Sequence, residues 1–252
     1  MIKIMSKVCW ITGGGSGIGA ELAKILSKDK YIVYISGRTK SKLGNIARNN
    51  KSIIPVPGDV SSLKDCKKIV NTIHKKFKKI NLVVMNAATY SPGSMETLNV
   101  DEIKKVIDIN LMGVINCLSS VISKMKKNKG GHLMIVSSPA GYRGLPGAGI
   151  YGVTKSAVTF LAETIKLEYE KFNIKVQVVH PGFVKTPMTD KNQFKMPFLI
   201  TPEKAAHKIA DKINTNDFEI YFPKRLILVM KLLKFFPNKL YFKLIRKLIQ
   251  LP

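Results

Sequence analysis

The stretch KVCWITGGGSGIG, residues Lys7–Gly19, decides the fold of this chain. Its first five residues, Lys7–Ile11, predict a short strand buried on both faces, and a helical period, Gly17–Ser27, follows the glycines. Glycines permit a sharp turn and a close backbone approach to phosphate, and a helix N-terminus offers free N–H groups. In this strand–turn–helix context the stretch predicts a dinucleotide-binding turn formed by Gly13, Gly15, Ser16, Gly17, Ile18 and Gly19.

Strands and helices alternate along the rest of the chain. Further strand-like runs, mostly short and apolar, are Tyr31–Ser36, Ile53–Val56, Asn81–Met85, His132–Ser137, Lys175–His180 and Glu219–Phe222. The helical periods between them are Ser41–Asn49, Ser62–Phe77, Asp101–Lys127, Tyr151–Phe172 and Thr201–Asn214. This alternation predicts an α/β fold, a doubly wound parallel sheet of about seven strands with helices on both faces. We expect residues 1–222 to form a single dinucleotide-binding catalytic domain and residues 223–252 a basic, amphipathic C-terminal extension of it.

The chain carries a strong positive charge, and the type and position of its basic residues bear on which partners it binds. Its 252 residues include 42 Lys and Arg against 16 Asp and Glu, a formal net charge of +26. Only five of the basic residues are arginine, the residue best suited to forked reading of phosphates and bases, so we do not expect a nucleic-acid partner. Residues 221–252 hold eight basic residues and no acidic one, which concentrates charge at the C-terminal end.

The cysteines and histidines are scattered. Cys9, Cys66 and Cys117 lie in apolar or helical stretches without disulfide or zinc spacing, which predicts small buried side chains in a reducing cytosol. The four histidines are equally dispersed, so no metal site is predicted. Because the first strand begins at Lys7 and no uncharged apolar stretch of about 18 residues occurs, we expect a cytoplasmic location with neither signal peptide nor membrane span.

Three further motifs follow the glycine turn in chain order. Asp59-Val60 follows the third strand, Asn86-Ala87-Ala88 the fourth, and Pro181-Gly182-Phe183-Val184-Lys185-Thr186 the sixth. With the T-G-x-x-x-G-x-G turn, they make residues 7–222 resemble the short-chain dehydrogenase/reductase family. The second motif departs from the family's N-N-A-G, because Met85 replaces its first Asn and Ala88 its Gly. The resemblance implies a Rossmann-type fold and an NAD(P)-dependent oxidoreductase.

The resemblance also implies roles in cofactor binding. Asp59 would hold the adenine amino group, Asn86 would stabilise the fourth strand and line the cofactor edge, and Thr186 would bind the carboxamide. Val60 and Ala87, next to Asp59 and Asn86, are also implied cofactor-binding residues. The cofactor residues implied in the last motif are Pro181, Gly182, Val184 and Thr186.

The loop after the second strand bears on the choice of nicotinamide. NAD-selective sites usually place an acid there to bind the ribose 2′-OH, but this position is Gly37 and residues 31–58 contain no Asp or Glu. Arg38 follows and can pair with a 2′-phosphate through charge-assisted hydrogen bonds. We predict a preference for NADP(H), with NAD(H) as the alternative cofactor and a solvated basic loop as the alternative interpretation of Arg38.

A second set of residues predicts the chemistry. Tyr151 and Lys155 share one face of a helix, thirteen residues after Ser138 at the end of the fifth strand. A phenol with a pKa of about 10 is a poor base, and a nearby ammonium favours its ionised form. Tyr151 is therefore the predicted general acid/base and Lys155 its tuning partner, while Ser138 can hydrogen-bond the substrate oxygen. By the resemblance, Lys155 also binds the nicotinamide ribose.

Two further polar residues, Ser137 and Asn110, have alternative interpretations. Ser137 can cap or pack. Asn110 matches the family's helix Asn, which by the resemblance holds a water linked to Lys155, and a buried polar kink is the alternative interpretation.

These residues predict the interconversion of a carbonyl and a secondary alcohol by hydride transfer. NADP(H)-linked turnover is the main hypothesis, and NAD-dependent alcohol oxidation is the alternative within the same class. A non-catalytic dinucleotide-binding protein at a membrane surface is a further alternative. The complete set of Ser138, Tyr151 and Lys155 argues against it.

The substrate and partners are predicted from the C-terminal third. The segment at about 183–201 is the expected substrate loop, and its Met and Phe residues predict either an apolar pocket or a lid packed on the core. By the resemblance, a homodimer or homotetramer would form through the helices Asp101–Lys127 and Tyr151–Phe172.

The C-terminal extension has an amphipathic pattern. Leu226–Phe236 is interrupted only by Lys231 and Lys234, and after Pro237 the residue Asn238 can cap a second helix. The basic face of that helix is Lys239, Lys243, Arg246 and Lys247, and its apolar stripe is Leu240, Tyr241, Leu244, Ile245, Leu248 and Ile249. This pattern predicts that 224–251 contacts an anionic membrane from the inner face, with a long-chain, lipid-like carbonyl or alcohol substrate. The alternative is a helix packed across a dimer interface or over the substrate mouth.

Overall fold

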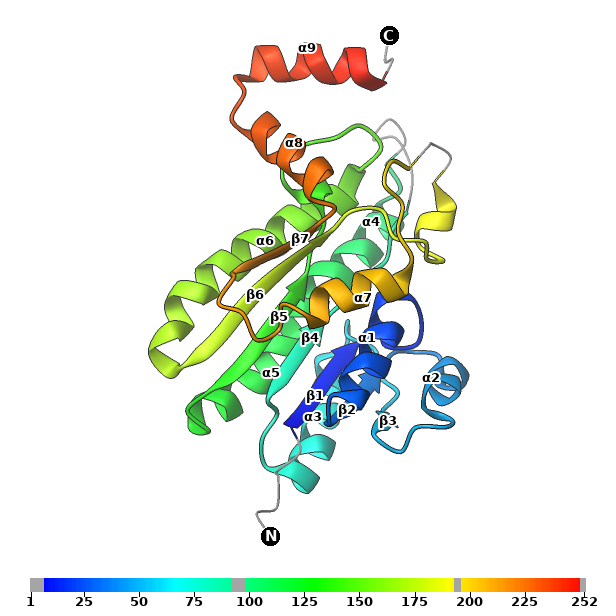
Figure 1. The fold of residues 1–252 in the computed structure, drawn as a ribbon, viewed down its shortest axis with the longest axis vertical. Helices are drawn as coiled ribbons and strands as arrows, with labels where there is room; N and C mark the ends of the chain where they lie inside the picture. The colour runs from blue at the N-terminus through cyan, green and yellow to red at the C-terminus, as the bar shows by residue number, and fades with distance from the viewer. Residues whose placement is uncertain (1–6, 92–97, 193–195, 250–252) are drawn as a thin grey trace.

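A seven-stranded parallel sheet forms the centre of the protein (Figure 1). The computed structural model describes residues 7–91, 98–192 and 196–249. The strands are β1 (Lys7–Thr12), β2 (Tyr31–Ser36), β3 (Ile53–Pro55), β4 (Leu82–Met85), β5 (Gly131–Val136), β6 (Ile174–Pro181) and β7 (Glu219–Phe222). Their order is β3-β2-β1-β4-β5-β6-β7, so β1 and β4 are neighbours at the point where the winding reverses. The predicted doubly wound, Rossmann-type sheet is confirmed.

Helices cover both faces of the sheet. Those on one face are α1 (Gly17–Lys28), α2 (Lys40–Ala47) and α7 (Pro202–Ala210), and those on the other are α3 (Leu63–Phe77), α4 (Val100–Ile107), α5 (Gly113–Lys127) and α6 (Gly149–Tyr169). Along β1 the side chains alternate between the two cores, with Trp10 facing α3, α5 and α6 and Ile11 facing α1. Burial on both faces explains why the strands are continuous apolar runs.

The expected single helix over Asp101–Lys127 is interrupted. A π-helical segment, Asp108–Met112, separates α4 from α5. It turns Asn110 inward, where its side chain bonds to the backbone of Thr89, so a tertiary contact accounts for the change of helix type. The whole run Val100–Lys127 is long and apolar enough to cross a membrane, but half of its most apolar stretch is buried in the fold, as is typical of a core helix.

The C-terminal extension forms two helices, α8 (Lys224–Lys234) and α9 (Asn238–Ile249), which extend beyond the end of β7 (Figure 1). We call them the α8–α9 pair. Tyr241 and Ile245 of the predicted apolar stripe are buried in a small cluster with Met230 and Leu233. That part of the stripe is therefore used inside the protein, while Leu240 stays exposed and the side chains of Leu248 and Ile249 lie outside the described part.

All three cysteines are buried, as predicted. The Sγ atoms of Cys66 on α3 and Cys117 on α5 lie 4.0 Å apart, where the two helices pack together. In residues 7–91, 98–192 and 196–249 no group of three or more His, Cys, Asp or Glu side chains could hold a metal ion.

Candidate active site

The glycine turn forms a cradle at the carboxyl edge of the sheet, beside the junction of β1 and β4. Gly17 has a φ of +56°, and a Cβ there would lie 3.0 Å from Cγ2 of Thr186. A Cβ on Gly19 would lie 2.5 Å from the carbonyl oxygen of Gly13. Side chains at either position would fill the cradle or strain it, so the turn fits the close approach of a dinucleotide pyrophosphate. The N-terminus of α1, preceded by Ser16, points free N–H groups at the same place.

Asn86 ties the end of β4 to the glycine turn. Its Nδ2 donates to the carbonyl oxygens of Thr12 and Gly13, at 3.0 and 3.3 Å. In return, the backbone N–H groups of Asn86 and Ala87 both donate to Oγ1 of Thr12 at 3.0 Å. The strand-stabilising contact predicted for Asn86 is therefore present, although Met85 and Ala88 depart from the family pattern. Its contact with a cofactor stays a prediction.

Arg38 lies in the loop between β2 and α2, next to the glycine turn. Gly14 N–H donates to the carbonyl oxygen of Ser36 at 3.1 Å, which places the end of β2 against the turn. Arg38 itself is exposed. Asp59 is on the adjoining loop after β3, where its Oδ1 accepts hydrogen bonds from the N–H and hydroxyl of Ser61. Gly58 N–H donates to the carbonyl oxygen of Gly37 at 3.1 Å, so the loops that carry Arg38 and Asp59 are adjacent, and their contacts with a cofactor stay predictions.

The motif after β6 lies on the other side of the turn. Val184 is buried and pairs with Ile200 in an isolated bridge, while Gly182 N–H donates to the carbonyl oxygen of Phe222 at 2.7 Å. Thr186 follows, with its Oγ1 3.3 Å from that of Thr189. Because Thr186 also approaches Gly17, the two predicted cofactor motifs come together in the fold.

Tyr151 and Ser138 form the predicted catalytic pair. Burial raises the pKa of Tyr151 to about 12, a hydrogen bond with Ser138 opposes that rise, and the charge of Tyr90 adds to it. Ser138 also accepts a hydrogen bond from the N–H of Ala140 at 3.2 Å, which caps the turn that follows β5. The serine is therefore fixed by the backbone next to the phenol.

Lys155 is deeply buried, with only 3% of its surface exposed. Its Nζ donates to the carbonyl oxygen of Val136 at 2.8 Å and lies 5.5 Å from the centre of the Tyr151 ring. Burial lowers the pKa of Lys155 to about 8. Burial is the largest influence on the pKa of Tyr151, and the predicted tuning of that pKa by Lys155 stays a prediction.

Asn110 and Ser137 form hydrogen bonds with residues next to Tyr151 and Ser138, not with these two side chains themselves. The Oδ1 of Asn110 accepts from Thr89 N–H at 2.7 Å, and its Nδ2 donates to Thr89 O and to Oγ1 of Thr154. Both ends of the amide thus have protein partners, and the water relay predicted for Asn110 stays a prediction. Ser137 packs in the core, where its hydroxyl donates to the carbonyl oxygen of Lys155 at 2.9 Å.

Tyr90 is a site residue that the sequence reasoning missed. It follows Asn86 by four positions, and its ring meets the ring of Tyr151 with centroids 5.2 Å apart. Lys191, on the loop after β6, donates to its carbonyl oxygen at 3.0 Å. The signal available in the sequence was an aromatic residue shortly after the carboxyl end of a central strand, where side chains of an α/β sheet meet a ligand.

A half-buried carboxylate, Glu219, was also missed. Glu219 on β7 lies 3.0 Å from Nδ1 of His180 and accepts hydrogen bonds from Tyr142 and Lys231. Burial acts to raise the pKa of Glu219, but these partners lower it to about 2. Because Lys231 belongs to α8 and Tyr142 to the loop before α6, this carboxylate joins the C-terminal extension to the catalytic side of the sheet.

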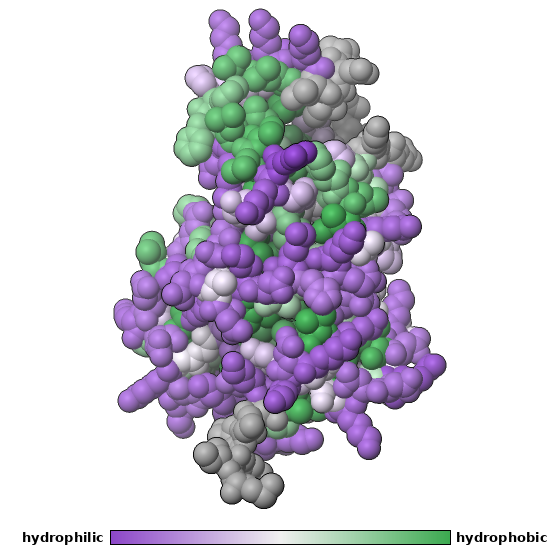
Figure 2. Space-filling view, in the orientation of Figure 1, coloured by the Kyte–Doolittle hydropathy of each residue, from purple (hydrophilic) through white to green (hydrophobic). Residues whose placement is uncertain are grey.

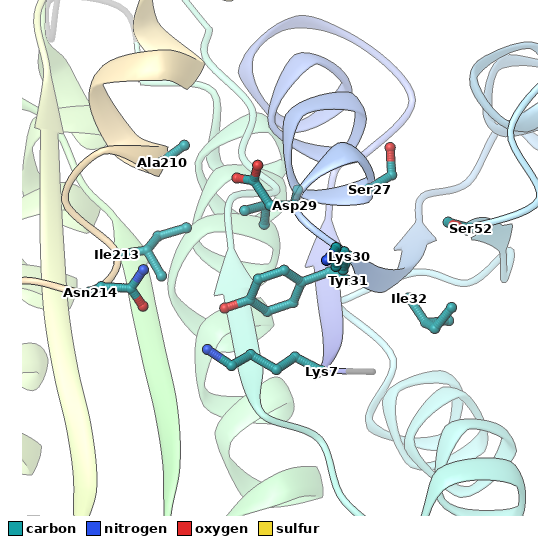
Figure 3. A pocket seen from close by; sticks show the side chains of 11 residues that line it. Lys7, Ser27, Asp29, Lys30, Tyr31, Ile32, Ser52, Ala210, Ile213 and Asn214 are labelled. Carbon is teal, nitrogen blue, oxygen red and sulfur yellow. The ribbon is translucent and has the colours of Figure 1, made fainter. Parts of the chain in front are cut away.

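A hollow of about 640 Å³ lies at the opposite, amino-terminal edge of the sheet (Figure 3). Lys7, Tyr31, Asp29 and Asn214 are among its lining residues. The side chain of Lys7 lies over the ring of Tyr31, 5.8 Å from its centre. The parallel strands run away from this hollow toward the glycine turn and Tyr151, so it is separate from the candidate site.

Comparison with known proteins agrees with this geometry. The short chain dehydrogenase family model matches residues 7–196. An uncharacterized oxidoreductase from Myxococcus xanthus is 29% identical over 98% of this chain and 100% of its own length. Another, from Listeria innocua, is 31% identical over 87% of this chain and 97% of its own length.

Solved structures show the same fold. A 3-ketoacyl-(acyl-carrier-protein) reductase from Brucella melitensis, complexed with NADH, superposes with a TM-score of 0.81 at 23% identity, covering 87% of this chain and 98% of that one. ElxO with NADP bound gives a TM-score of 0.77 at 27% identity, covering 86% and 98%. The chain belongs to the short-chain dehydrogenase family, and it is an oxidoreductase with the NAD(P)-binding Rossmann fold.

Proposed function

We propose that this protein is an NADP(H)-dependent oxidoreductase that interconverts a carbonyl and a secondary alcohol on an apolar, long-chain substrate. The observation that carries the proposal is the meeting of Ser138, Tyr151 and Lys155 at the carboxyl edge of the sheet, next to the glycine cradle. In this proposal residues 1–222 are the catalytic domain and residues 223–252 extend it.

Each of the three side chains has a distinct role. When bound, the nicotinamide supplies or accepts a hydride at the substrate carbon. Ser138 donates a hydrogen bond to the substrate oxygen, and Tyr151 gives that oxygen a proton during reduction or takes one from it during oxidation. Lys155, as an ammonium in a buried setting, favours the ionised phenol and holds the nicotinamide ribose. A proton path through Asn110 would reload Tyr151.

The preference for NADP(H) rests on Arg38. Its exposed guanidinium lies on the loop beside the glycine turn, and it can form a forked pair with a 2′-phosphate. ElxO, at 27% identity, holds NADP in its structure, which supports the proposal, whereas the reductase from Brucella melitensis holds NADH. NAD(H) is the alternative that a direct comparison of cofactors decides.

An apolar substrate is supported by the loop after β6. Phe198 and Leu199 are 51% and 42% exposed, on the same segment that carries Val184 and Thr186. Exposed apolar side chains at the mouth of a site favour contact with an apolar ligand. A lid packed on the core stays the alternative, because Val184 and Ile200 of the same loop pack against the core.

A membrane contact is supported by the outer face of α8. Leu228, Val229, Leu232 and Phe235 follow helical spacing and are each 55–83% exposed, and Figure 2 shows apolar side chains gathered over the α8–α9 pair. Lys224, Arg225, Lys234 and Lys239 lie near them and are exposed. An apolar face bordered by cations fits the surface of an anionic bilayer. We propose that the protein acts in the cytoplasm and binds the inner membrane face through the pair.

A homodimer or homotetramer is supported by α6. Val153, Phe160 and Leu167 recur every seven residues and are 59%, 72% and 78% exposed, so they form an outward apolar stripe. Such a stripe on a helix that also carries the catalytic residues fits a subunit interface through α6 and the α4–α5 run. The mass in solution, measured by light scattering, tests this part of the proposal.

The central experiment is NADPH consumption against methyl ketones from 2-butanone to 2-undecanone, with and without anionic liposomes. We expect turnover to rise with chain length. Tyr151→Phe should reduce kcat by roughly 100- to 10,000-fold because it removes the acid/base group, while NADPH still binds. A Tyr151→Phe variant that retains most of its activity would show that the assignment is wrong.

A further inference from the structure

The loop between Ser138 and Tyr151, residues 139–148, is fastened to the α8–α9 pair by one arginine. Arg143 Nη1 donates to the carbonyl oxygens of Leu233 at 2.5 Å and Phe236 at 2.7 Å, and Nη2 donates to Oδ1 of Asn238 at 2.7 Å. These carbonyls end α8, where helical carbonyls lack partners within the helix and favour a cation. Asn238, the first residue of α9, presents its side-chain oxygen to Arg143.

Tyr241 makes a second tie between the same two parts. Its ring lies under the guanidinium of Arg143, 3.8 Å from the ring centre, and is 1% exposed. Its hydroxyl donates to the carbonyl oxygen of Gly144 at 2.6 Å. A planar guanidinium can stack on a ring and bond to carbonyls in its plane at once, which a lysine ammonium cannot do.

Apolar contacts also join the α8–α9 pair to the loop 139–148 and to the motif after β6. Tyr142 and Leu145 of the loop pack against the buried cluster of the pair. At the base of α8, a Cβ on Gly182 would lie 2.8 Å from Cδ of Pro223 and 3.2 Å from Leu226. The α8–α9 pair therefore contacts both the loop between Ser138 and Tyr151 and Gly182, in the motif that ends at Thr186.

The catalytic residues themselves are fixed by other contacts. Lys155 Nζ bonds to Val136 of β5, and Ser137 bonds to the carbonyl oxygen of Lys155. A Cβ on Gly141 would lie 2.7 Å from the backbone of Lys155, so the start of the loop is packed directly on α6. Loss of Arg143 would release the outer part of the loop and leave the positions of Ser138 and Tyr151 unchanged.

We propose that Arg143 is a positioning residue for the substrate. It fastens the α8–α9 pair to residues 142–148, so that the pair holds this part of the loop in place beside the bound substrate. The inference rests on the proposed function for the identity of the substrate side. The tie itself predicts a measurable change in the loop whatever the substrate.

The test compares full-length variants that differ in this tie. Arg143→Ala removes it, Arg143→Lys keeps the charge without the fork, and Tyr241→Phe removes only the bond to Gly144. Arg48→Ala, at an exposed arginine outside this tie and outside the α8–α9 pair, is the matched control. The measurements are amide hydrogen exchange of residues 142–149, the dissociation constant of NADPH, and kcat and KM for the same methyl ketones.

We expect Arg143→Ala to accelerate exchange in residues 142–149 and to raise the KM for 2-undecanone by about tenfold, the loss of one modest interaction. The kcat and the NADPH dissociation constant should stay close to those of the parent. Arg143→Lys should recover part of the loss, Tyr241→Phe should show a smaller change in the same direction, and Arg48→Ala none.

Unchanged exchange in both Arg143→Ala and Tyr241→Phe would overturn the proposal. Faster exchange with an unchanged KM would refute the role in substrate positioning, and so would a fall in kcat or in NADPH affinity at constant KM. If the parent protein reduces none of the ketones, the proposed substrate class is wrong, and the exchange measurement still decides whether Arg143 holds the loop.

Discussion

The rings of Tyr90 and Tyr151 meet edge to face, with their planes at 72°. Tyr90 thereby covers one side of the proposed acid/base, and burial is the main reason why the pKa of Tyr151 is raised. Tyr90→Ala should admit water and lower the pKa of Tyr151. Because alcohol oxidation needs the ionised phenol, the oxidation rate should rise at lower pH than in the parent, by several-fold near pH 8.

The measurement is kcat/KM for alcohol oxidation as a function of pH. Tyr90→Phe is the matched control, since it keeps the ring and loses only the hydroxyl. Its pH profile should stay close to that of the parent. An identical profile for Tyr90→Ala would show that Tyr90 does not shield Tyr151.

The second prediction concerns Arg38 and the cofactor. Arg38→Ala should raise the KM for NADPH by roughly 10- to 100-fold, the effect of losing hydrogen bonds between charged groups, and leave the KM for NADH nearly unchanged. Arg48→Ala is the control, because Arg48 is an exposed arginine that bonds to Asn45 on the same helical segment. Steady-state kinetics with both cofactors measure the ratio. An unchanged preference in Arg38→Ala would rule out this role.

The third prediction concerns the buried charge of Lys155. Its pKa is lowered to about 8 in the folded protein, so between that value and its ordinary pKa of 10.5 the unfolded chain binds more protons. Stability from this group therefore rises with pH across that window. Lys155→Met should abolish turnover but raise the melting temperature near pH 7, and the gain should shrink at about pH 9.5, where the parent lysine is mostly neutral.

Thermal unfolding of the cofactor-free protein at the two pH values measures this effect. Lys166→Met, on the same helix, is the control, since Lys166 forms only a surface pair with Glu170. It should change the melting temperature little at either pH. A Lys155→Met protein that is less stable than the parent near pH 7 would show that the bond from Lys155 to Val136 outweighs the cost of burying the charge.

The fourth prediction tests the membrane surface. Leu232 is 60% exposed in the middle of the outer face of α8, so Leu232→Glu should sharply reduce co-sedimentation with vesicles that contain phosphatidylglycerol. Leu63→Glu, at an exposed leucine on α3, makes the same chemical change elsewhere and should bind like the parent. Binding should also weaken at high salt. Equal co-sedimentation of both variants and the parent would remove the membrane proposal.

Much of the fold could be predicted from the sequence because the strands are buried on both faces and are short apolar runs between helical periods. The glycine turn and the Tyr151–Lys155 spacing also located the candidate site, since both are local patterns. Residues whose roles depend on distant contacts could not be found this way. The π-helical break depends on Asn110 meeting Thr89, and the inward turn of Tyr241 depends on a loop nearly 100 residues earlier.

The shifted pKa values of Lys155 and Tyr151 could not be predicted from the sequence either. The i, i+4 spacing predicts that lysine and tyrosine share a face, but the extent of burial decides which influence on each pKa is larger. Burial depends on β5 and on Tyr90, which the spacing does not include. Local patterns thus located the candidate catalytic side chains, and the assembled fold determines how far each is buried.

The close packing of Gly182 against Pro223 and Leu226 has an evolutionary consequence. The proposed catalytic residues lie before this junction in the chain, and the α8–α9 pair lies after it. Lineages could therefore exchange or reshape the terminal helices and acquire new substrates while inheriting the same redox core. For the engineer, the junction at Pro223 marks a place to graft helices from relatives, provided that each graft brings a partner for Arg143.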